Sequence, residues 1–243
     1  MSGLIPLLRA PGLAGRTDVL HGFSTRFNAT GGRLDLGRDT TPALWAEVAA
    51  AVGVPGGAVA RVHQVHGAGL FEVDGGGVAG KGDALLTTTP GVILAVRTAD
   101  CVPVLFVLGS PVRAVAAVHA GWRGVAANIL GVTVRALRTI DPGAPIHAVV
   151  GPAISGPNYE VGEEVVDQIC ATGVPEACFV TRPPGAPRPF ADVRAAARWQ
   201  LQRDGITSLE TLDRCTFDDP TLWSHRRDGL SRGSLAALVA IAP

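Results

Sequence analysis

The sequence is poor in cysteine and in charge, and each shortage excludes a class of protein. Its four cysteines show no disulfide spacing, which argues against a small secreted scaffold held by disulfides. Lys/Arg runs never exceed a pair such as Arg226-Arg227, and the net charge is +0, so no nucleic-acid-binding surface is expected. Charged residues make up 17% of the chain and hydrophobic residues 47%, a composition that excludes disorder.

The sequence also lacks long hydrophobic runs. The longest are the length of a strand, such as residues 102–108, whereas a membrane-spanning helix needs about 20 apolar residues. The apolar run near the N-terminus is interrupted by Pro6 and Arg9, which does not fit a secretion signal. We therefore expect a cytoplasmic protein without a membrane or nucleic-acid partner, present as a monomer or a homodimer.

The hydrophobic pattern predicts an α/β protein, a single layered domain over residues 1–243 with a mixed β-sheet. The length allows one large domain with a sizeable core. The predicted strands cover residues 19–24, 59–65, 69–73, 84–88, 92–97, 104–108, 112–118, 147–150 and 235–241. The predicted helices cover residues 42–52 after a Thr41 cap, 122–140, 161–171, and 193–204 after an Asp192 cap.

Three separate segments each offer one side chain suited to a transition metal. They contain His66 in Gln-Val-His-Gly, Cys101 in Ala-Asp-Cys-Val-Pro, and His119 in Val-His-Ala-Gly-Trp-Arg-Gly. A structural zinc site usually has four ligands, often from closely spaced cysteine pairs, and this chain has no such pair. Two imidazoles and one thiolate instead make three protein ligands, the number found at a catalytic zinc that keeps one position open.

Each of the three residues also has a structural interpretation. A lone histidine beside a strand is usually structural, and a lone cysteine is more often a small buried hydrophobe than a ligand. Gly67 favours the metal interpretation, because a glycine turn would expose His66 at the end of a strand. His119 carries the strongest signal, because it ends an apolar strand just before a sharp turn at Gly121. The helix expected after that turn would direct free backbone N–H groups and its positive dipole end toward the metal.

Two aspartates lie close to the ligand segments in the sequence. Asp100 precedes Cys101, and Asp83 lies in a Gly-Asp-Ala-Leu segment. Either carboxylate could orient a ligand histidine or handle a proton, and the sequence does not divide these roles.

Five further residues are candidates for binding substrate. Arg26 and Arg123 could bind phosphate, because the guanidinium fork matches phosphate oxygens, although structural ion pairing is an equal alternative. Trp122 could stack on a planar ligand, with core packing as the default. Asn158 and Tyr159 follow a Gly/Pro-rich loop and are predicted to form a wall of the site.

These motifs resemble those of the bacterial YfiH-like, laccase-domain proteins, also called multicopper polyphenol oxidase-type proteins and now described as purine nucleoside phosphorylases. The likeness covers nearly the whole chain, in the right order. It is carried by residues 21–26, 64–67, 82–85, 98–104, 117–124, 151–152, 159–162 and 225–229.

The resemblance implies a layered α/β fold with a mixed sheet and a zinc site built from His66, Cys101 and His119. It implies phosphorolysis of adenosine, inosine, guanosine and methylthioadenosine, and deamination of adenosine. The expected small-molecule partners are purine nucleosides and phosphate. Copper remains an alternative to zinc, because the divalent affinity order favours copper.

A copper-dependent polyphenol oxidase is the second hypothesis. A multicopper oxidase needs a His₂Cys centre and a histidine-rich trinuclear cluster. The chain has six histidines, so a His₂Cys centre leaves 6 − 2 = 4, and these are scattered at positions 21, 63, 147 and 225. A multicopper site is therefore not expected, whereas copper chemistry at the single site stays open.

Two other hypotheses remain. Cys101 could be the nucleophile of a cysteine hydrolase, for instance one that acts on a cell-wall precursor amide, with His66 or His119 as its base. The chain could also be a non-enzymatic, metal-dependent interaction module. That hypothesis is the weakest, because an open ligand position and nearby arginines suit catalysis better than scaffolding.

Overall fold

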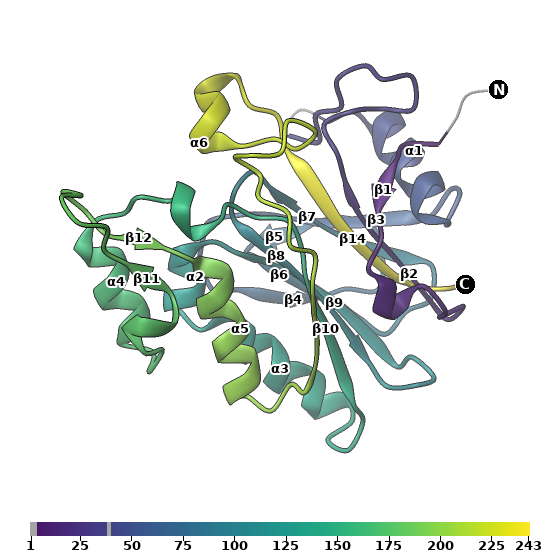
Figure 1. Ribbon diagram of the computed structural model, residues 1–243. Coiled ribbons are helices and arrows are strands. Elements are labelled where there is room, and N and C mark those ends of the chain that lie inside the picture. The colour runs from purple at the N-terminus through teal and green to yellow at the C-terminus, as the bar shows by residue number, and fades with distance from the viewer. Residues whose placement is uncertain (1–3, 38–39) are drawn as a thin grey trace.

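Two six-stranded β-sheets, packed face to face, form the centre of the protein (Figure 1). The computed structural model describes residues 4–37 and 40–243. In spatial order, the first sheet consists of β1 (Leu7–Leu8), β2 (Val19–Ser24), β14 (Leu235–Ile241), β7 (Val92–Thr98), β3 (Ala58–His63) and β5 (Gly77–Lys81). The second consists of β13 (Ser208–Thr211), β10 (Ile146–Val150), β8 (Val102–Leu108), β9 (Ala114–Ala120), β6 (Ala84–Thr87) and β4 (Leu70–Glu72). A short separate ribbon pairs β11 (Val180–Thr181) with β12 (Phe190–Ala191).

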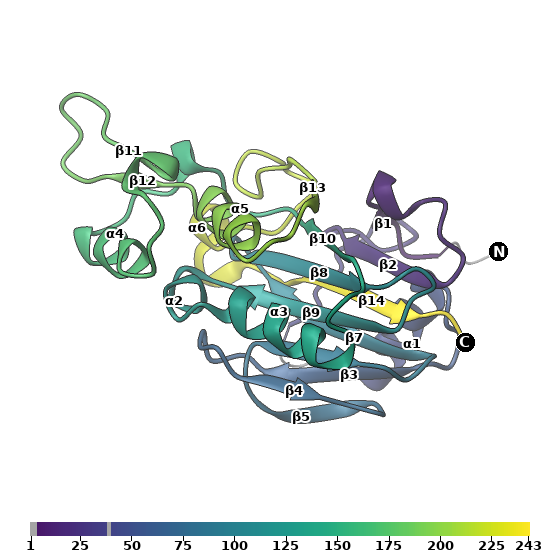
Figure 2. The same ribbon diagram turned by 90° about the horizontal axis from the view of Figure 1, so that it is seen from below.

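Alternating side chains on the strands build the layers of the molecule. On β7, Leu94 and Val96 join a buried cluster with Leu105 of β8, which fills the space between the two sheets. The intervening Ile93 faces the opposite way and packs with Val48 of the first helix, as the period of two in a strand requires. Figures 1 and 2 show that helix on one side of the sheets and the other large helices on the opposite side.

Two of the helices begin at the caps that the sequence predicts. Helix α1 (Pro42–Val52) begins after Thr41, whose side chain accepts a hydrogen bond from the backbone N–H of Leu44, and ends at Gly53 with φ 111°. Asp192 caps α5 (Val193–Arg203) in the same way. The remaining helices are α2 (Trp122–Ala126), α3 (Ile129–Ile140), α4 (Glu163–Cys170) and α6 (His225–Asp228). Among the described residues, none of the helices is long and apolar enough to cross a membrane.

The layered α/β architecture is confirmed, with two corrections to its details. The mixed strands form two large sheets instead of one. The predicted helix over residues 122–140 is broken into α2 and α3, because Asn128 adopts a left-handed conformation with φ 55°, which asparagine tolerates better than most residues. The helix that follows His119 is therefore only five residues long, too short to carry the dipole effect expected from a longer one. The single-domain organisation stays a prediction.

Three connections between the sheets meet at one edge of the molecule. Strands β5, β3 and β7 are parallel neighbours in the first sheet, and each is followed by a strand of the second sheet, β6, β4 and β8 respectively. The connections therefore leave from the same edge, and they contain Asp83, His66 and Cys101. Strand β9 lies between β6 and β8 and runs antiparallel to both, so its C-terminal end, with His119, reaches the same edge.

Candidate metal centre

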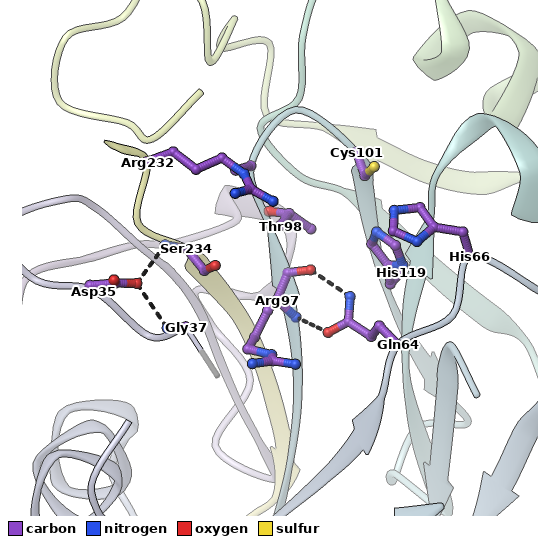
Figure 3. A pocket seen from close by; sticks show the side chains of 11 residues that line it. Asp35, Gly37, Gln64, His66, Arg97, Thr98, Cys101, His119, Arg232 and Ser234 are labelled. Carbon is purple, nitrogen blue, oxygen red and sulfur yellow. Dashed lines mark hydrogen bonds between the residues drawn. The ribbon is translucent and has the colours of Figure 1, made fainter. Parts of the chain in front are cut away.

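The three predicted ligand residues lie together at this edge (Figure 3). The ligand atoms of His66, Cys101 and His119 all lie within 4.8 Å of one another, and the two imidazole rings meet edge to face. Within residues 4–37 and 40–243, this is the one group of three or more His, Cys, Asp or Glu side chains close enough to share a metal ion. Ligand atoms of a tetrahedral zinc lie roughly 3.5 Å apart, so the donor set suits such an ion and its atoms lie close to the spacing required.

The backbone around the ligands adopts conformations that few residues favour. His66 lies beyond the end of β3 with φ 60°, and Asp100, beside Cys101, has φ 90°. A positive φ in a residue other than glycine is uncommon, costs free energy, and recurs at functional sites. His66 is exposed, Cys101 is half-buried and His119 is buried, so the cluster extends from the interior to the surface.

Asp83 is the fully buried centre of the hydrogen bonds that hold two of the ligands. Its Oδ1 lies 2.8 Å from Nδ1 of His119 and accepts the backbone N–H of His66 at 2.9 Å. Its Oδ2 accepts the backbone N–H groups of Val65 and Gly67 at 3.2 and 2.7 Å. Burial opposes ionisation of Asp83, but these hydrogen bonds outweigh it and keep its pKa below the usual value.

An ionised Asp83 also decides the tautomer of His119. A carboxylate can only accept hydrogen bonds, so Nδ1 of His119 carries the proton and donates it. The other ring nitrogen, Nε2, is then left as the ligand atom. A carboxylate behind a histidine ligand is the arrangement found around catalytic zinc ions, where it fixes the ring and raises its basicity.

Cys101 and His119 shift each other's pKa in opposite directions. Burial is the largest effect on Cys101 and opposes its ionisation, but the charge of His119 and hydrogen bonds from His119 and His66 outweigh burial and lower its pKa to about 6. Burial likewise disfavours the imidazolium form of His119, but the thiolate and Asp83 raise its pKa to about 9. Without a metal, the site therefore holds a thiolate and an imidazolium near neutral pH, and the thiolate is the form that binds metals.

Gly121 leaves the space that the ligands occupy. A Cβ atom at this position would lie 3.1 Å from Sγ of Cys101 and 3.1 Å from Cδ2 of His66. Any larger residue would therefore press on two of the three ligands. Its backbone φ is an ordinary −67°, so the requirement for glycine here comes from space and not from conformation.

A pocket of about 380 Å³ opens beside the ligand cluster (Figure 3). This volume is within the range of sites for small molecules. The lining residues include two arginines, Arg97 from β7 and Arg232 from the segment before β14. The pocket is lined by Asp35, Gly37, Gln64, His66, Arg97, Thr98, Ala99, Cys101, His119, Arg232 and Ser234.

Sequence reasoning did not identify Arg97, Arg232, Asp35 or Gln64 as site residues. Arg97 carried a usable signal, because it interrupts the otherwise apolar strand β7. Asp35 and Arg232 lie in irregular segments nearly 200 residues apart, and no local pattern connects them. Gln64 lies in the same Gln-Val-His-Gly motif as His66, but an amide side chain is not a usual ligand of a transition metal.

The two candidate aspartates have different contacts. Asp83 contacts His119, as described above, whereas Asp100 contacts the C-terminal part of the chain. Asp100 accepts the hydroxyl of Thr216 at 2.6 Å and the backbone N–H of Arg226, at the start of α6, at 2.6 Å. Asp100 therefore anchors α6 beside the centre, and Asp83 is the carboxylate that orients a ligand.

The predicted phosphate-binding arginines lie outside the pocket lining. Arg26 lies over the ring of Trp223 at 4.2 Å and donates a hydrogen bond to the carbonyl of Pro220. Arg123 lies over the ring of Trp122 at 4.1 Å. The binding roles of Arg26, Arg123 and Trp122 stay predictions.

The two predicted wall residues, Asn158 and Tyr159, have different contacts. Asn158 donates hydrogen bonds to Ser155 and Asp218 and therefore ties loops together. Tyr159 is close enough to Cys101 to respond to its charge: burial first, and then the thiolate, raise the pKa of Tyr159 to about 12. The guanidinium of Arg226 lies 4.9 Å from the Tyr159 ring.

Comparison with known proteins places the chain in a family. The sequence pattern described as "Multi-copper polyphenol oxidoreductase laccase" matches residues 27–242. The chain belongs to the YfiH family of laccase-domain proteins. The purine nucleoside phosphorylase of Deinococcus radiodurans is 39% identical over an alignment that covers 98% of this chain and 93% of that protein. The purine nucleoside phosphorylase YfiH of Escherichia coli is 37% identical over 181 residues, which cover 73% and 72% of the two chains.

The fold agrees with that of a solved structure similar to this chain. YlmD from Geobacillus stearothermophilus superposes with a TM-score of 0.83 and 29% sequence identity, over 98% of this chain and 96% of that one. The names of the YfiH relatives indicate an enzyme, and this chain carries a His-Cys-His cluster able to hold a metal.

Proposed function

We propose that this YfiH-family chain is a zinc-dependent purine nucleoside phosphorylase, with His66, Cys101 and His119 as the metal ligands. The observation that carries the proposal is the three-ligand cluster in the wall of a pocket that also contains two arginines. The relatives named purine nucleoside phosphorylase support it. When bound, zinc would supply a Lewis-acidic centre with one open position for water or a substrate oxygen.

The pocket offers complementary groups for both substrates. Arg97 and Arg232 line it, and their guanidinium groups suit the oxygens of phosphate. Asp35 accepts two backbone hydrogen bonds, from Gly37 and Ser234, through Oδ1. Its Oδ2 would accept a ribose hydroxyl. These contacts would hold phosphate and nucleoside beside each other, which lowers the entropic cost of bringing them together.

The proposed reaction breaks the bond between the sugar and the base. A phosphate oxygen forms a bond to C1′ of the ribose, while the bond from C1′ to the purine nitrogen breaks. The electron pair leaves with the purine, which takes up a proton from solvent. Adenosine, inosine and guanosine yield the free base and ribose 1-phosphate, and methylthioadenosine yields adenine and 5-methylthioribose 1-phosphate. Asp83 acts throughout by holding His119 in one tautomer and His66 in its turn.

We propose deamination of adenosine as a second activity of the same pocket. Water replaces the 6-amino group of the purine and releases ammonia, so this reaction consumes no phosphate. The observation that favours it is again the ligand set, because three protein ligands leave a position for water. The copper oxidase hypothesis gains less support: all six histidines lie in the described residues, and only His66 and His119 join the cluster.

Product analysis tests the proposal directly. Protein of measured zinc content is incubated with adenosine, with and without phosphate, and the products are separated by liquid chromatography. Phosphorolysis yields adenine and ribose 1-phosphate only with phosphate, and deamination yields inosine without it. Zinc-replete protein that produces neither would reject the proposal.

A cysteine variant separates this proposal from a cysteine hydrolase. Cys101→Ala should lose bound metal and both activities together, whereas Cys178→Ala, at an exposed cysteine, should retain them. A thiolate bound to zinc should resist alkylation until a chelator removes the metal. Full turnover by chelated protein, abolished by alkylation of Cys101, would instead favour the hydrolase.

A further inference from the structure

In the proposed metal centre, different contacts fix the distance between each pair of ligand residues. His119 lies in the backbone ladder between β8 and β9, where it pairs with Pro103, and Cys101 directly precedes Val102, which pairs with Ala120. Seven residue pairs form this ladder, so the sheet itself sets the distance between the backbones of the two ligand residues.

The separation of His66 and His119 depends on a side chain. One oxygen of Asp83, Oδ1, accepts both the backbone N–H of His66 and the ring Nδ1–H of His119. His66 lies outside the strands and is exposed, so no ladder supports it. It therefore needs a second restraint to fix its position relative to Cys101.

Gln64 provides that restraint. Its amide Nε2 donates to the backbone carbonyl of Arg97 at 2.7 Å, and its Oε1 accepts the backbone N–H of Arg97 at 2.8 Å (Figure 3). The side-chain amide thus imitates a peptide group and continues the parallel pairing of β3 with β7 past the end of β3. Gln64 lies two residues before His66, and Arg97 lies four residues before Cys101.

We propose that Gln64 is a positioning residue of the metal centre, which fixes His66 relative to Cys101 through the backbone of β7. This inference rests on the proposed function only in taking the three residues as metal ligands. Asp83 and Gln64 then restrain the exposed ligand from two sides, one toward His119 and one toward Cys101. Losing either restraint leaves His66 on a turn that must be ordered when the metal binds.

Two variants test the proposal. Gln64→Met keeps the length of the side chain but removes both hydrogen bonds, and Gln64→Asn keeps the amide but is one methylene too short to make both. We expect zinc affinity, measured by competition with a chromophoric chelator, to fall about 10- to 100-fold in each, the usual effect of removing a group that supports a ligand. Gln168→Met, on the exposed face of α4, is the matched control and should bind zinc like the wild type.

Cobalt substitution gives a readout that does not depend on activity. The thiolate-to-cobalt charge-transfer band should remain in both Gln64 variants, because Cys101 and His119 stay joined by the β8–β9 ladder. The ligand-field bands should change, because His66 is displaced. Thermal unfolding of the metal-free proteins checks that the variants fold.

Three results would overturn the role of Gln64. They are zinc affinity within twofold of the wild type in both variants, unchanged cobalt spectra, and a raised KM for nucleoside at unchanged zinc affinity. The last would make Gln64 a substrate contact, which its place in the pocket lining allows.

The proposed function fails separately: wild-type protein that binds zinc but turns over no nucleoside rejects the activity and leaves the role of Gln64 standing. A wild type without a cobalt–thiolate band rejects the metal centre itself.

Discussion

The protein contains two buried histidines whose surroundings shift their pKa values in opposite directions. His119 in β9 is 3% exposed and His21 in β2 is 4% exposed. Nε2 of His21 accepts a hydrogen bond from the backbone N–H of Ala10 at 2.8 Å, whereas Nδ1 of His119 donates to the carboxylate of Asp83. The two side chains are equally hidden from water, so burial alone does not distinguish a structural histidine from a ligand.

The charges near each ring explain the difference. Burial, and then the positive charges of Arg9 and His147, lower the pKa of His21 to about 4, so this ring stays neutral. Burial acts on His119 in the same sense, but the Cys101 thiolate and Asp83 reverse it and raise its pKa to about 9. A backbone donor needs only a neutral acceptor, whereas a buried carboxylate and thiolate need a positive partner. In the proposed function a metal ion supplies that charge.

The largest expected effect is on the pH dependence of zinc binding, which should tighten about a hundredfold between about pH 6.5 and 8.5. Bound zinc requires the thiolate and a neutral ring at His119. The pKa of Cys101 is about 6, so its proton is already lost in this range. The pKa of His119 is about 9, so each zinc must displace one proton, which corresponds to about tenfold per pH unit. Calorimetry in buffers of different ionisation enthalpy counts the proton. Affinity independent of pH would mean that His119 is neutral before zinc binds.

Removing the buried carboxylate should make the surroundings of His119 more like those of His21. Asp83→Ala leaves the N–H groups of three residues and the His119 ring without their acceptor. Zinc affinity should fall about 10- to 100-fold, and the free energy of unfolding of the metal-free protein by roughly 3–5 kcal/mol. Chelator competition and denaturant titration measure the two effects. Asp213→Ala, at an exposed aspartate, is the control; equal zinc affinity in the two variants would exclude a role for Asp83.

Adding one methyl group at Gly121 should perturb the centre by less. In Gly121→Ala the new Cβ would press on Cys101 and His66, each 3.1 Å away. Overpacking of this kind costs about 1–3 kcal/mol, and zinc affinity should fall about tenfold as the ligands move apart. Gly15→Ala has open space around its Cβ and is the matched control. Cobalt spectra identical to those of the wild type would show that the site absorbs the methyl group.

The smallest expected effect on zinc binding is that of replacing the other buried histidine. His21→Gln keeps an acceptor for Ala10 and should leave zinc affinity within twofold. Acid stability should change instead. Because the folded-state pKa of His21 lies below its unfolded value, the unfolded chain binds an extra proton between about pH 6.5 and 4, and stability is lost as pH falls through that window.

The size of that loss follows from the shift in the pKa of His21. From about 6.5 to about 4 it amounts to roughly 3 kcal/mol, which the variant should not lose. Denaturant titrations at pH 7 and pH 4 compare the two proteins. An equal loss of stability in both would mean that His21 does not cause the acid sensitivity.

Much of the fold could be predicted from local patterns. The strand over residues 19–24 and the strand over residues 235–241 have the predicted bounds, and the Thr41 and Asp192 caps start their helices as expected. The break at Asn128 was missed, because apolar residues continue at helical spacing on both sides of it. The division into two sheets was missed because the hydrophobic pattern of a buried strand does not indicate the sheet to which the strand belongs.

By itself, the sequence determined which chemistry is present: two histidines and one cysteine in glycine-bounded motifs, with no cysteine pair to suggest a structural zinc. Only the tertiary structure decided which groups support them. It assigned Asp83 to His119 and Asp100 to α6, and brought Gln64 to β7. It also placed Arg97 and Arg232 in one pocket. The physical reason is that side-chain period and capping act over a few residues, whereas these contacts join strands far apart in the chain. Their positions follow from the parallel strands β5, β3 and β7, which cross to the second sheet at the same edge.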